Sequence, residues 1–122
     1  MLVDTSIWID HLRQGDAGLA QALQSELVWT HSFVLGELAC GNLRSREEVM
    51  DLLQALPRLA TVSDKEALFF IEEHRLMGQG IGYVDAHLLA SVRLAGVSLW
   101  TRDKRLLTVA TELSLAHANS RH

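Results

Sequence analysis

Cysteine and proline are almost absent from this sequence of 122 residues. The single cysteine, Cys40, cannot form an internal disulfide or share a structural zinc ion with a second thiol. This agrees with a reducing compartment and argues against redox chemistry. With one proline, Pro57, and no low-complexity tract or fixed-period repeat, nothing marks a linker between two folding units. We therefore expect a single domain over residues 1–122.

Long apolar runs and an excess of positive charge are also missing. No run of about eighteen apolar residues could span a membrane, and the N-terminal segment MLVDTSIW lacks the basic and longer apolar stretches of a signal peptide. We therefore expect a cytoplasmic protein with no membrane partner. The formal net charge of −4 argues against a broad basic surface that binds DNA by counterion release alone. A nucleic-acid substrate would need positive charge from another source.

The sequence does contain short apolar segments that alternate with helical patterns. The predicted strands cover residues 1–5, 27–30, 59–62 and 97–101. Helical spacing predicts helices over residues 7–13, from 16 to the next strand, 32–41, 46–56, from 63 or 64 to 77, 83–94 and from 103 towards 112. The expected N-caps are Asp16, Ser32 and either Ser63 or Asp64, and Gly96 is expected to stop a helix. The alternation indicates an α/β fold, a sandwich in which helices flank a short, mainly parallel central sheet.

Two aspartates stand at the ends of predicted strands. Asp4 closes the first strand, and Asp103 follows the fourth. Ligands of open parallel sheets bind beyond the carboxyl ends of the strands, so both side chains would face one crevice if the two strands were neighbours. The order of the strands does not follow from the sequence. A simpler interpretation is that Asp103 is a helix N-cap and that Asp4 is a polar residue that ends a strand.

Two further acids lie on helix faces that are otherwise apolar. Glu37 in HSFVLGELACG and Asp85 in GIGYVDAHLLASV share their faces with apolar neighbours three and four residues away. A buried carboxylate must be paired, hydrogen-bonded or metal-bound, or must reach water. The alternatives stay open at this point. Asp85 lies in a first helical turn, where the helix dipole favours a negative charge by about 0.3–1 kcal/mol, and Glu37 could extend from the rim of the core.

Carboxylates that converge in one pocket repel each other unless cations neutralise them. Magnesium is a hard ion that takes oxygen ligands and couples carboxylates to substrate phosphates. A pair of such ions about 3.5–4 Å apart could activate water during phosphodiester cleavage. Bound cations would also supply the positive charge that the chain lacks.

Four segments together carry a resemblance to a known family. MLVDTSIWID, VLGELACG, IGYVDAHLLASV and LWTRDKRL resemble, in this order and over nearly the whole chain, the PIN domain of VapC-type toxin ribonucleases from type II toxin–antitoxin pairs. The resemblance implies a PIN-like α/β/α sandwich and an endoribonuclease that hydrolyses RNA with Mg²⁺, or Mn²⁺ in its place. The family's catalytic and metal-binding acids fall on Asp4, Glu37, Asp85 and Asp103. The accompanying hydroxyl residues fall on Ser6 and Thr101, which would position water or an acid.

The resemblance also implies partners. VapC-type toxins form homodimers and are neutralised by a small VapB-like antitoxin that covers the active cleft. Arg102, Lys104 and Arg105, next to the last acid, are candidates for holding RNA phosphates. Their alternative interpretation is a solvated start of a helix.

Two rival functions fit part of the pattern. A Mg²⁺-binding phospho-receiver module would use Asp4, Asp64 and Lys104, but it expects adjacent acids after the first strand and gives Glu37 and Asp85 no task. The other rival is a PIN domain that binds RNA without cutting it. The histidines form no HExxH or Cys/His pattern, so a zinc site has little support.

Overall fold

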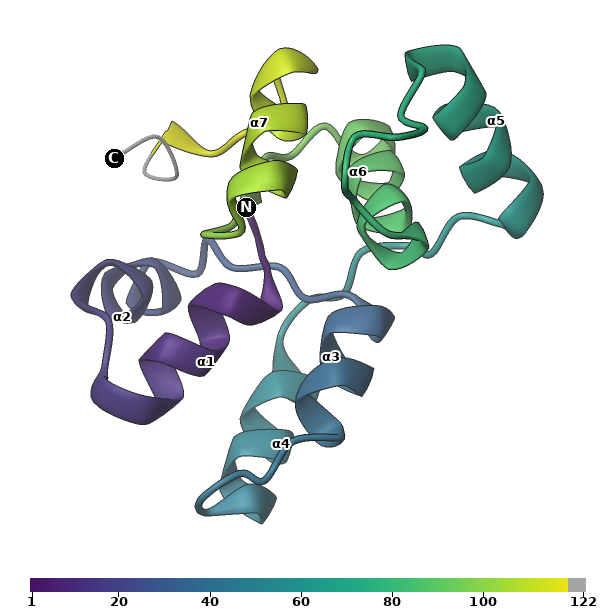
Figure 1. Ribbon diagram of the computed structural model, residues 1–122. Helices are drawn as coiled ribbons and strands as arrows, with labels where there is room; N and C mark the ends of the chain where they lie inside the picture. Colours follow the sequence, from purple (N-terminus) through teal and green to yellow (C-terminus); the bar gives the residue numbers. More distant parts are fainter. Residues whose placement is uncertain (119–122) are drawn as a thin grey trace.

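The fold is built from helices around a very small parallel sheet. The computed structural model describes residues 1–118. The elements in chain order are β1 (Leu2–Val3), α1 (Thr5–Gln14), α2 (Ala17–Gln24), α3 (Ser32–Ala39), α4 (Arg46–Ala55), α5 (Asp64–His74), α6 (Tyr83–Ala95), β2 (Leu99–Trp100) and α7 (Lys104–Glu112). β1 lies near the middle of the molecule, with α1 and α2 to one side of it and α5 and α6 to the other in the view of Figure 1.

The two strands pair in parallel, with Leu2 opposite Leu99 and Val3 opposite Trp100. Isolated parallel bridges extend this pairing on both sides, joining Leu2 to Trp29, Thr30 to Arg58, and Leu99 to Ala116. In the sheet, residues 29–30 lie on one side of β1 and residue 58 lies beyond them, while β2 lies on the opposite side of β1. The order of the strands therefore reverses between β1 and β2, which is where open α/β sheets place their ligand sites.

The predicted strand over residues 27–30 is reduced to isolated bridges at Trp29 and Thr30, and the predicted strand over residues 59–62 is wrong, because the bridge to Thr30 is made by Arg58. Thr30 N–H donates to Pro57 O at 2.8 Å, and Leu59 N–H donates to Thr30 O at 2.9 Å. Proline has no backbone N–H, so Pro57 cannot donate to this ladder, and the pairing ends there. The first and fourth predicted strands are shortened to β1 and β2, and the parallel direction is confirmed.

Several predicted helix ends are confirmed by hydrogen bonds. The side chain of Asp16 accepts from Leu19 N–H at 2.9 Å and caps α2. Ser63 and Glu66 form a capping box at the start of α5, in which each side chain accepts from the backbone N–H of the other residue. Gly96 ends α6 with a left-handed φ of 70°.

Two other predicted helix ends are wrong. Ser32 is the first residue of α3, and the N-cap is His31, whose Nδ1 accepts from Phe33 N–H at 3.0 Å. An imidazole nitrogen can thus replace the expected hydroxyl. The helix predicted to reach Met77 ends at His74, because Arg75 adopts a left-handed φ of 52°.

The buried apolar residues form a core that includes both strands and the inner faces of the helices. Leu2, Val3 and Leu99 are fully buried, which fits short parallel strands covered on both faces. Trp8 and Trp100 also pack in this core. Within residues 1–118, no helix is both long enough and apolar enough to cross a bilayer. The single domain over residues 1–122 stays a prediction, since residues 119–122 lie outside the described part.

Candidate active site

The parallel pairing brings the first and last candidate acids to one edge of the sheet. β1 ends at Val3 and β2 ends at Trp100, and these residues are register partners. Asp4 N–H donates to Trp100 O at 2.9 Å, which extends the pairing by one residue. Asp4 and Asp103 therefore follow neighbouring strands, the arrangement that the sequence alone could not establish.

Two hydroxyl groups hold the buried carboxylate of Asp4. Thr101 Oγ1 donates to Asp4 Oδ2 at 2.7 Å, and Ser6 Oγ donates to the same oxygen at 2.9 Å. Ser6 Oγ in turn accepts from Arg102 N–H at 3.0 Å, and Thr101 Oγ1 accepts from Asp103 N–H at 3.1 Å. The hydroxyls thus fix the orientation of Asp4 and connect it to the loop before α7.

Asp85 approaches the same edge from the first turn of α6. Its Oδ2 accepts from Gly82 N–H at 3.1 Å, as expected for an acid at a helix start. Burial raises the pKa of Asp85, the Gly82 hydrogen bond lowers it in part, and the negative charges of Asp4 and Asp103 raise it further. The last effect places all three carboxylates within electrostatic reach of one another.

Glu37 reaches this group from α3 and is exposed at its rim. Partial burial raises the pKa of Glu37, the charges of Asp4 and Asp85 raise it further, and the hydroxyl of Thr5 lowers it in part. The four predicted acids, which come from four separate segments, are therefore linked by electrostatic repulsion.

The simpler interpretation of Asp103 also holds. Its Oδ1 accepts from Arg105 N–H at 3.0 Å and from Leu106 N–H at 3.1 Å, so Asp103 is the N-cap of α7. A capping carboxylate retains a second oxygen and its charge, so the capping role does not prevent it from binding a ligand.

The chemistry of this group fits a hard divalent cation. Its donors are carboxylate oxygens, the ligands that Mg²⁺ prefers. The ion pairs within residues 1–118 join His87 to Asp64, and Arg102 to Asp10 and Asp16, so none neutralises the four acids. In the same part of the chain, no three His, Cys, Asp or Glu side chains are close enough together to hold a metal ion as they lie. The four acids are coupled electrostatically, and binding of an ion by several of them would require their side chains to approach one another.

The three predicted RNA-binding residues differ in how they are engaged. The guanidinium of Arg102 pairs with Asp10 at 2.6 Å and also with Asp16, and these two carboxylates raise its pKa. Arg105 lies over the loop before α6, where a Cβ on Gly80 would be only 2.5 Å from Arg105 Cδ. Lys104 is exposed at the start of α7. Arg102 therefore has a structural task that the sequence did not reveal.

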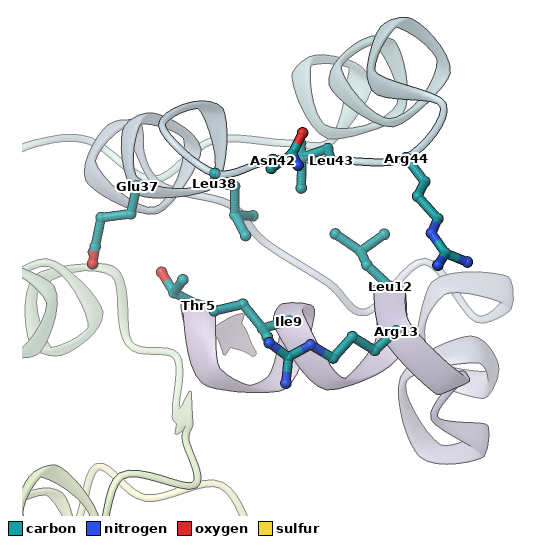
Figure 2. A pocket seen from close by; sticks show the side chains of 10 residues that line it. Thr5, Ile9, Leu12, Arg13, Glu37, Leu38, Asn42, Leu43 and Arg44 are labelled. Carbon is teal, nitrogen blue, oxygen red and sulfur yellow. The ribbon is translucent and has the colours of Figure 1, made fainter.

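A cavity of about 420 Å³ opens between α1, α3 and the loop after α3. Thr5 and Glu37 lie at one end of it, and Arg44 lies at the other (Figure 2). The side chain of Arg13 runs along α1 beside the cavity. The apolar side chains between the two ends are Ile9, Leu12, Leu38 and Leu43. Sequence reasoning missed both arginines, because neither lies in a motif and only the packing of α1 against α3 places both beside one cavity.

Buried histidines are a second feature that the sequence did not predict. Nε2 of His31 lies 3.1 Å from Ser91 Oγ, and its Nδ1 accepts a backbone N–H. Burial lowers the pKa of His31 to about 4, and electrostatic interactions with His87 and Arg58 lower it further. His87 is also buried, against the rings of Phe33 and Tyr83. Both histidines pack in the interior.

The fold and this acidic edge define a class of protein. Residues 1–112 match the family model of the PIN domain, and the chain belongs to the PIN domain family. It is 45% identical over 119 residues to Ribonuclease VapC32 of Mycobacterium tuberculosis, found in two strains, and the match covers 97% of this chain and 96% of the relative. The resemblance read from the four sequence segments is thereby confirmed.

Two solved structures share the fold. The crystal structure of PAE2754 from Pyrobaculum aerophilum has a TM-score of 0.66 at 17% identity and covers 88% of this chain and 82% of its own. The structure of FitAB bound to an IR36 DNA fragment has a TM-score of 0.60 at 16% identity and covers 90% of each chain. These likenesses confirm the predicted PIN-like α/β fold.

Proposed function

We propose that this chain is a metal-dependent endoribonuclease that hydrolyses RNA phosphodiester bonds and acts as the toxin of a toxin–antitoxin pair. It is a ribonuclease of the VapC family, since it matches a named VapC ribonuclease at 45% identity over nearly the full length of both chains. The observation that supports metal dependence is the meeting of four mutually repelling carboxylates at the edge where β1 and β2 end.

Asp4, Glu37, Asp85 and Asp103 are the proposed ligands and catalytic acids for Mg²⁺, with Mn²⁺ as a substitute. When bound, such a cation stabilises charge on the phosphate and makes water more acidic. The protein's own residues supply orientation and proton transfer. Ser6 and Thr101 fix Asp4 through its Oδ2. The raised pKa values of Glu37 and Asp85 make their carboxylates stronger bases than usual, suited to accept a proton from attacking water.

The proposed macromolecular partners are an RNA substrate and a VapB-like antitoxin. An antitoxin arginine would suit the acidic edge, because its planar guanidinium binds carboxylates in a bidentate manner. Among the predicted phosphate contacts we retain Lys104 and Arg105, whose side chains form no ion pair within residues 1–118. Arg102 is the weaker candidate, because its guanidinium is held by two aspartates. The cytoplasmic location stays a prediction from the sequence.

A homodimer is also part of the proposal. On α5 and α6, the large apolar side chains of Leu68, Phe69 and Leu94 are 56%, 67% and 68% exposed. Phe69 and Leu94 line a shallow groove between these two helices. Adjacent exposed apolar side chains of this size are typical of protein interfaces. A second copy of the chain is the proposed partner for this surface.

The phospho-receiver alternative is not supported by the structure. It needs Asp4, Asp64 and Lys104 in one site. Asp64 is exposed at the start of α5, where it accepts a hydrogen bond of 2.8 Å from Tyr83 Oη and lies 3.5 Å from His87. The repulsion linking Asp4 to Glu37 and Asp85, together with the family membership, favours the nuclease.

The test is cleavage of end-labelled RNA by protein freed of antitoxin, with Mg²⁺, with Mn²⁺ and with EDTA. We expect cleavage that requires metal and is lost in Asp4→Asn. Asp51→Asn is the matched control, since Asp51 is an exposed aspartate on α4. Equal cleavage by wild type and Asp4→Asn would mean contamination. Metal-dependent RNA binding without cleavage would favour a PIN domain that binds RNA and does not cut it.

A further inference from the structure

The cavity between α1 and α3 is continuous with the proposed catalytic edge. Thr5 and Glu37 line one end of the cavity (Figure 2). Glu37 is one of the four acids and is coupled to Asp4 and Asp85, and Thr5 directly follows Asp4. A molecule that lies in this cavity would therefore extend directly from the acids.

Two arginines line the cavity with positive charge that the protein does not neutralise, Arg13 along the α1 wall and Arg44 at the far end (Figure 2). Arg13 and Arg44 are exposed, and within residues 1–118 neither side chain forms an ion pair or a hydrogen bond. The neighbouring Arg46 differs, because its guanidinium is already hydrogen-bonded. Arg46 donates to the backbone carbonyls of Ala39 and Gly41 at 2.6 and 3.1 Å and so shapes the loop that carries Arg44. The unpaired arginines are therefore available to an anion.

The space between the two ends is apolar. Leu12, Leu38 and Leu43 separate Glu37 from Arg44 (Figure 2). Its volume, about 420 Å³, lies in the range of small-molecule sites. Apolar walls suit the face of a base or a sugar, while the acids with a bound cation and the arginines suit phosphates.

An RNA strand complements this arrangement better than a peptide does. Successive phosphates of one strand could reach the cation-binding acids at one end, Arg13 along the wall and Arg44 at the other end. A peptide would need a cation beside Glu37 and a carboxylate beside Arg44. Resting on the proposed ribonuclease function, we infer that this cavity holds the nucleotide next to the cleaved bond, with Arg13 along the wall and Arg44 at the far end each binding one phosphate on its outer side. The two arginines are positioning residues.

The experiment that tests this measures RNA binding against salt concentration. Labelled single-stranded RNA is bound by protein that carries Asp4→Asn, so that the strand stays intact, in the presence of Mg²⁺. Each phosphate contact contributes about 0.7 to the slope of log K against log salt for a single strand. We expect Arg13→Gln and Arg44→Gln each to reduce the slope by about 0.7, and the double variant by about 1.4. Lysine at either position should restore the slope, because the charge returns.

Arg58→Gln is the matched control, since Arg58 is exposed and lines neither this cavity nor the groove on α5 and α6. In the otherwise wild-type protein, the arginine variants should raise KM with little change in kcat. A dinucleotide that lacks the outer phosphates should be cleaved equally by all variants.

An unchanged slope in the double variant would overturn the inference, as would an equal loss in Arg58→Gln. If the slope is unchanged and the double variant no longer retains co-expressed antitoxin, the cavity takes an acidic peptide. The salt slopes and the retention of antitoxin are both measured without RNA cleavage. A wild type that fails to cut RNA would refute the proposed function without changing the meaning of the slopes.

Discussion

Thr101 and Asp4 are 97 positions apart in the chain, and the Thr101 hydroxyl donates a hydrogen bond of 2.7 Å to the Asp4 carboxylate. This contact joins the residue after β2 to the residue after β1. It depends on the parallel pairing of Val3 with Trp100, which places the two residues side by side. The same hydroxyl accepts from Asp103 N–H, so it connects two of the proposed catalytic acids.

Replacing Thr101 by valine should therefore impair both stability and cleavage. Valine keeps the shape but removes the hydroxyl, leaving a buried carboxylate without one of its donors. Hydrogen bonds to charged groups contribute about 1.5–3 kcal/mol, and we expect a loss of unfolding free energy in this range. Urea denaturation and kcat/KM measure the two effects. Thr101→Ser keeps the hydroxyl and serves as control, and equal behaviour of the two variants would contradict the assigned role.

Metal binding should appear as a difference in thermal stability. Without metal, Asp4→Asn should be as stable as the wild type or slightly more stable, because it relieves repulsion with Glu37 and Asp85. Added Mg²⁺ should raise the Tm of the wild type more than that of the variant, since a ligand that binds only the native state stabilises it. Thermal scans with and without Mg²⁺ measure this, and equal shifts would contradict the metal site.

Acid should destabilise the protein through His31. Its pKa is about 4 in the folded protein, against 6.5 for the free group, so the unfolded chain takes up the proton first. The stability that the neutral ring provides is present above pH 6.5 and is lost as the pH falls towards 4. The loss should reach about 2 kcal/mol at pH 5.

The raised pKa values of Glu37 and Asp85 act in the opposite direction, because protonation of these acids favours the folded state. The difference between wild type and His31→Asn at each pH separates the two effects. Urea denaturation between pH 7 and 5 should show the wild type losing more stability than the variant. Parallel curves would contradict the prediction.

Because Arg102 is engaged in ion pairs, we expect its replacement to lower the free energy of unfolding modestly and to leave RNA binding unchanged. Arg102 joins α1 to the start of α2 through Asp10 and Asp16. Because these groups are partly exposed, Arg102→Gln should lower the unfolding free energy by at most about 1 kcal/mol, and less at high salt. The salt slope of RNA binding should match that of the wild type. A slope reduced by about 0.7 would restore Arg102 as a phosphate-binding residue.

The proposed dimer predicts a change of mass in solution. Phe69→Glu would place a charge in the apolar surface of α5 and α6 and should yield a monomer in light scattering, with little change in the folded monomer because Phe69 is 67% exposed. Leu52→Glu is the control, since Leu52 is a 46% exposed apolar residue on α4. A monomeric wild type, or a dimer that persists in Phe69→Glu, would contradict this interface.

The helices and their caps were largely predictable from the sequence because their signals are local. Asp16 and the Ser63–Glu66 capping box lie within a few residues of the turns that they stabilise. The exceptions have physical causes. His31 caps α3 with an imidazole nitrogen in place of a hydroxyl, and Arg75 ends α5 through a left-handed conformation that its residue type does not predict.

The strands and the pocket were harder to predict because they depend on contacts distant in sequence. Residues 27–30 have the composition of a strand, but their pairing is limited by Pro57 on the neighbouring segment. Similarly, nothing near Arg13 in the sequence indicates Arg44. The acids were predictable as a set because each lies in a short segment that resembles the PIN family, and the structure places them within electrostatic reach. Their catalytic roles remain a proposal.

The pairing of β1 with β2 determines when, during synthesis of the chain, the acidic site can form. The first strand leaves the ribosome early, but its partner β2 and the residues Thr101 and Asp103 are made almost a hundred residues later. At synthesis rates of about 5–20 residues per second, the first acid waits several seconds for its neighbours. No nascent chain that ends before Asp103 holds the complete acidic group. A cell that makes this protein is therefore exposed to an assembled nuclease only after Asp103 has been made, which leaves time for a partner to be made.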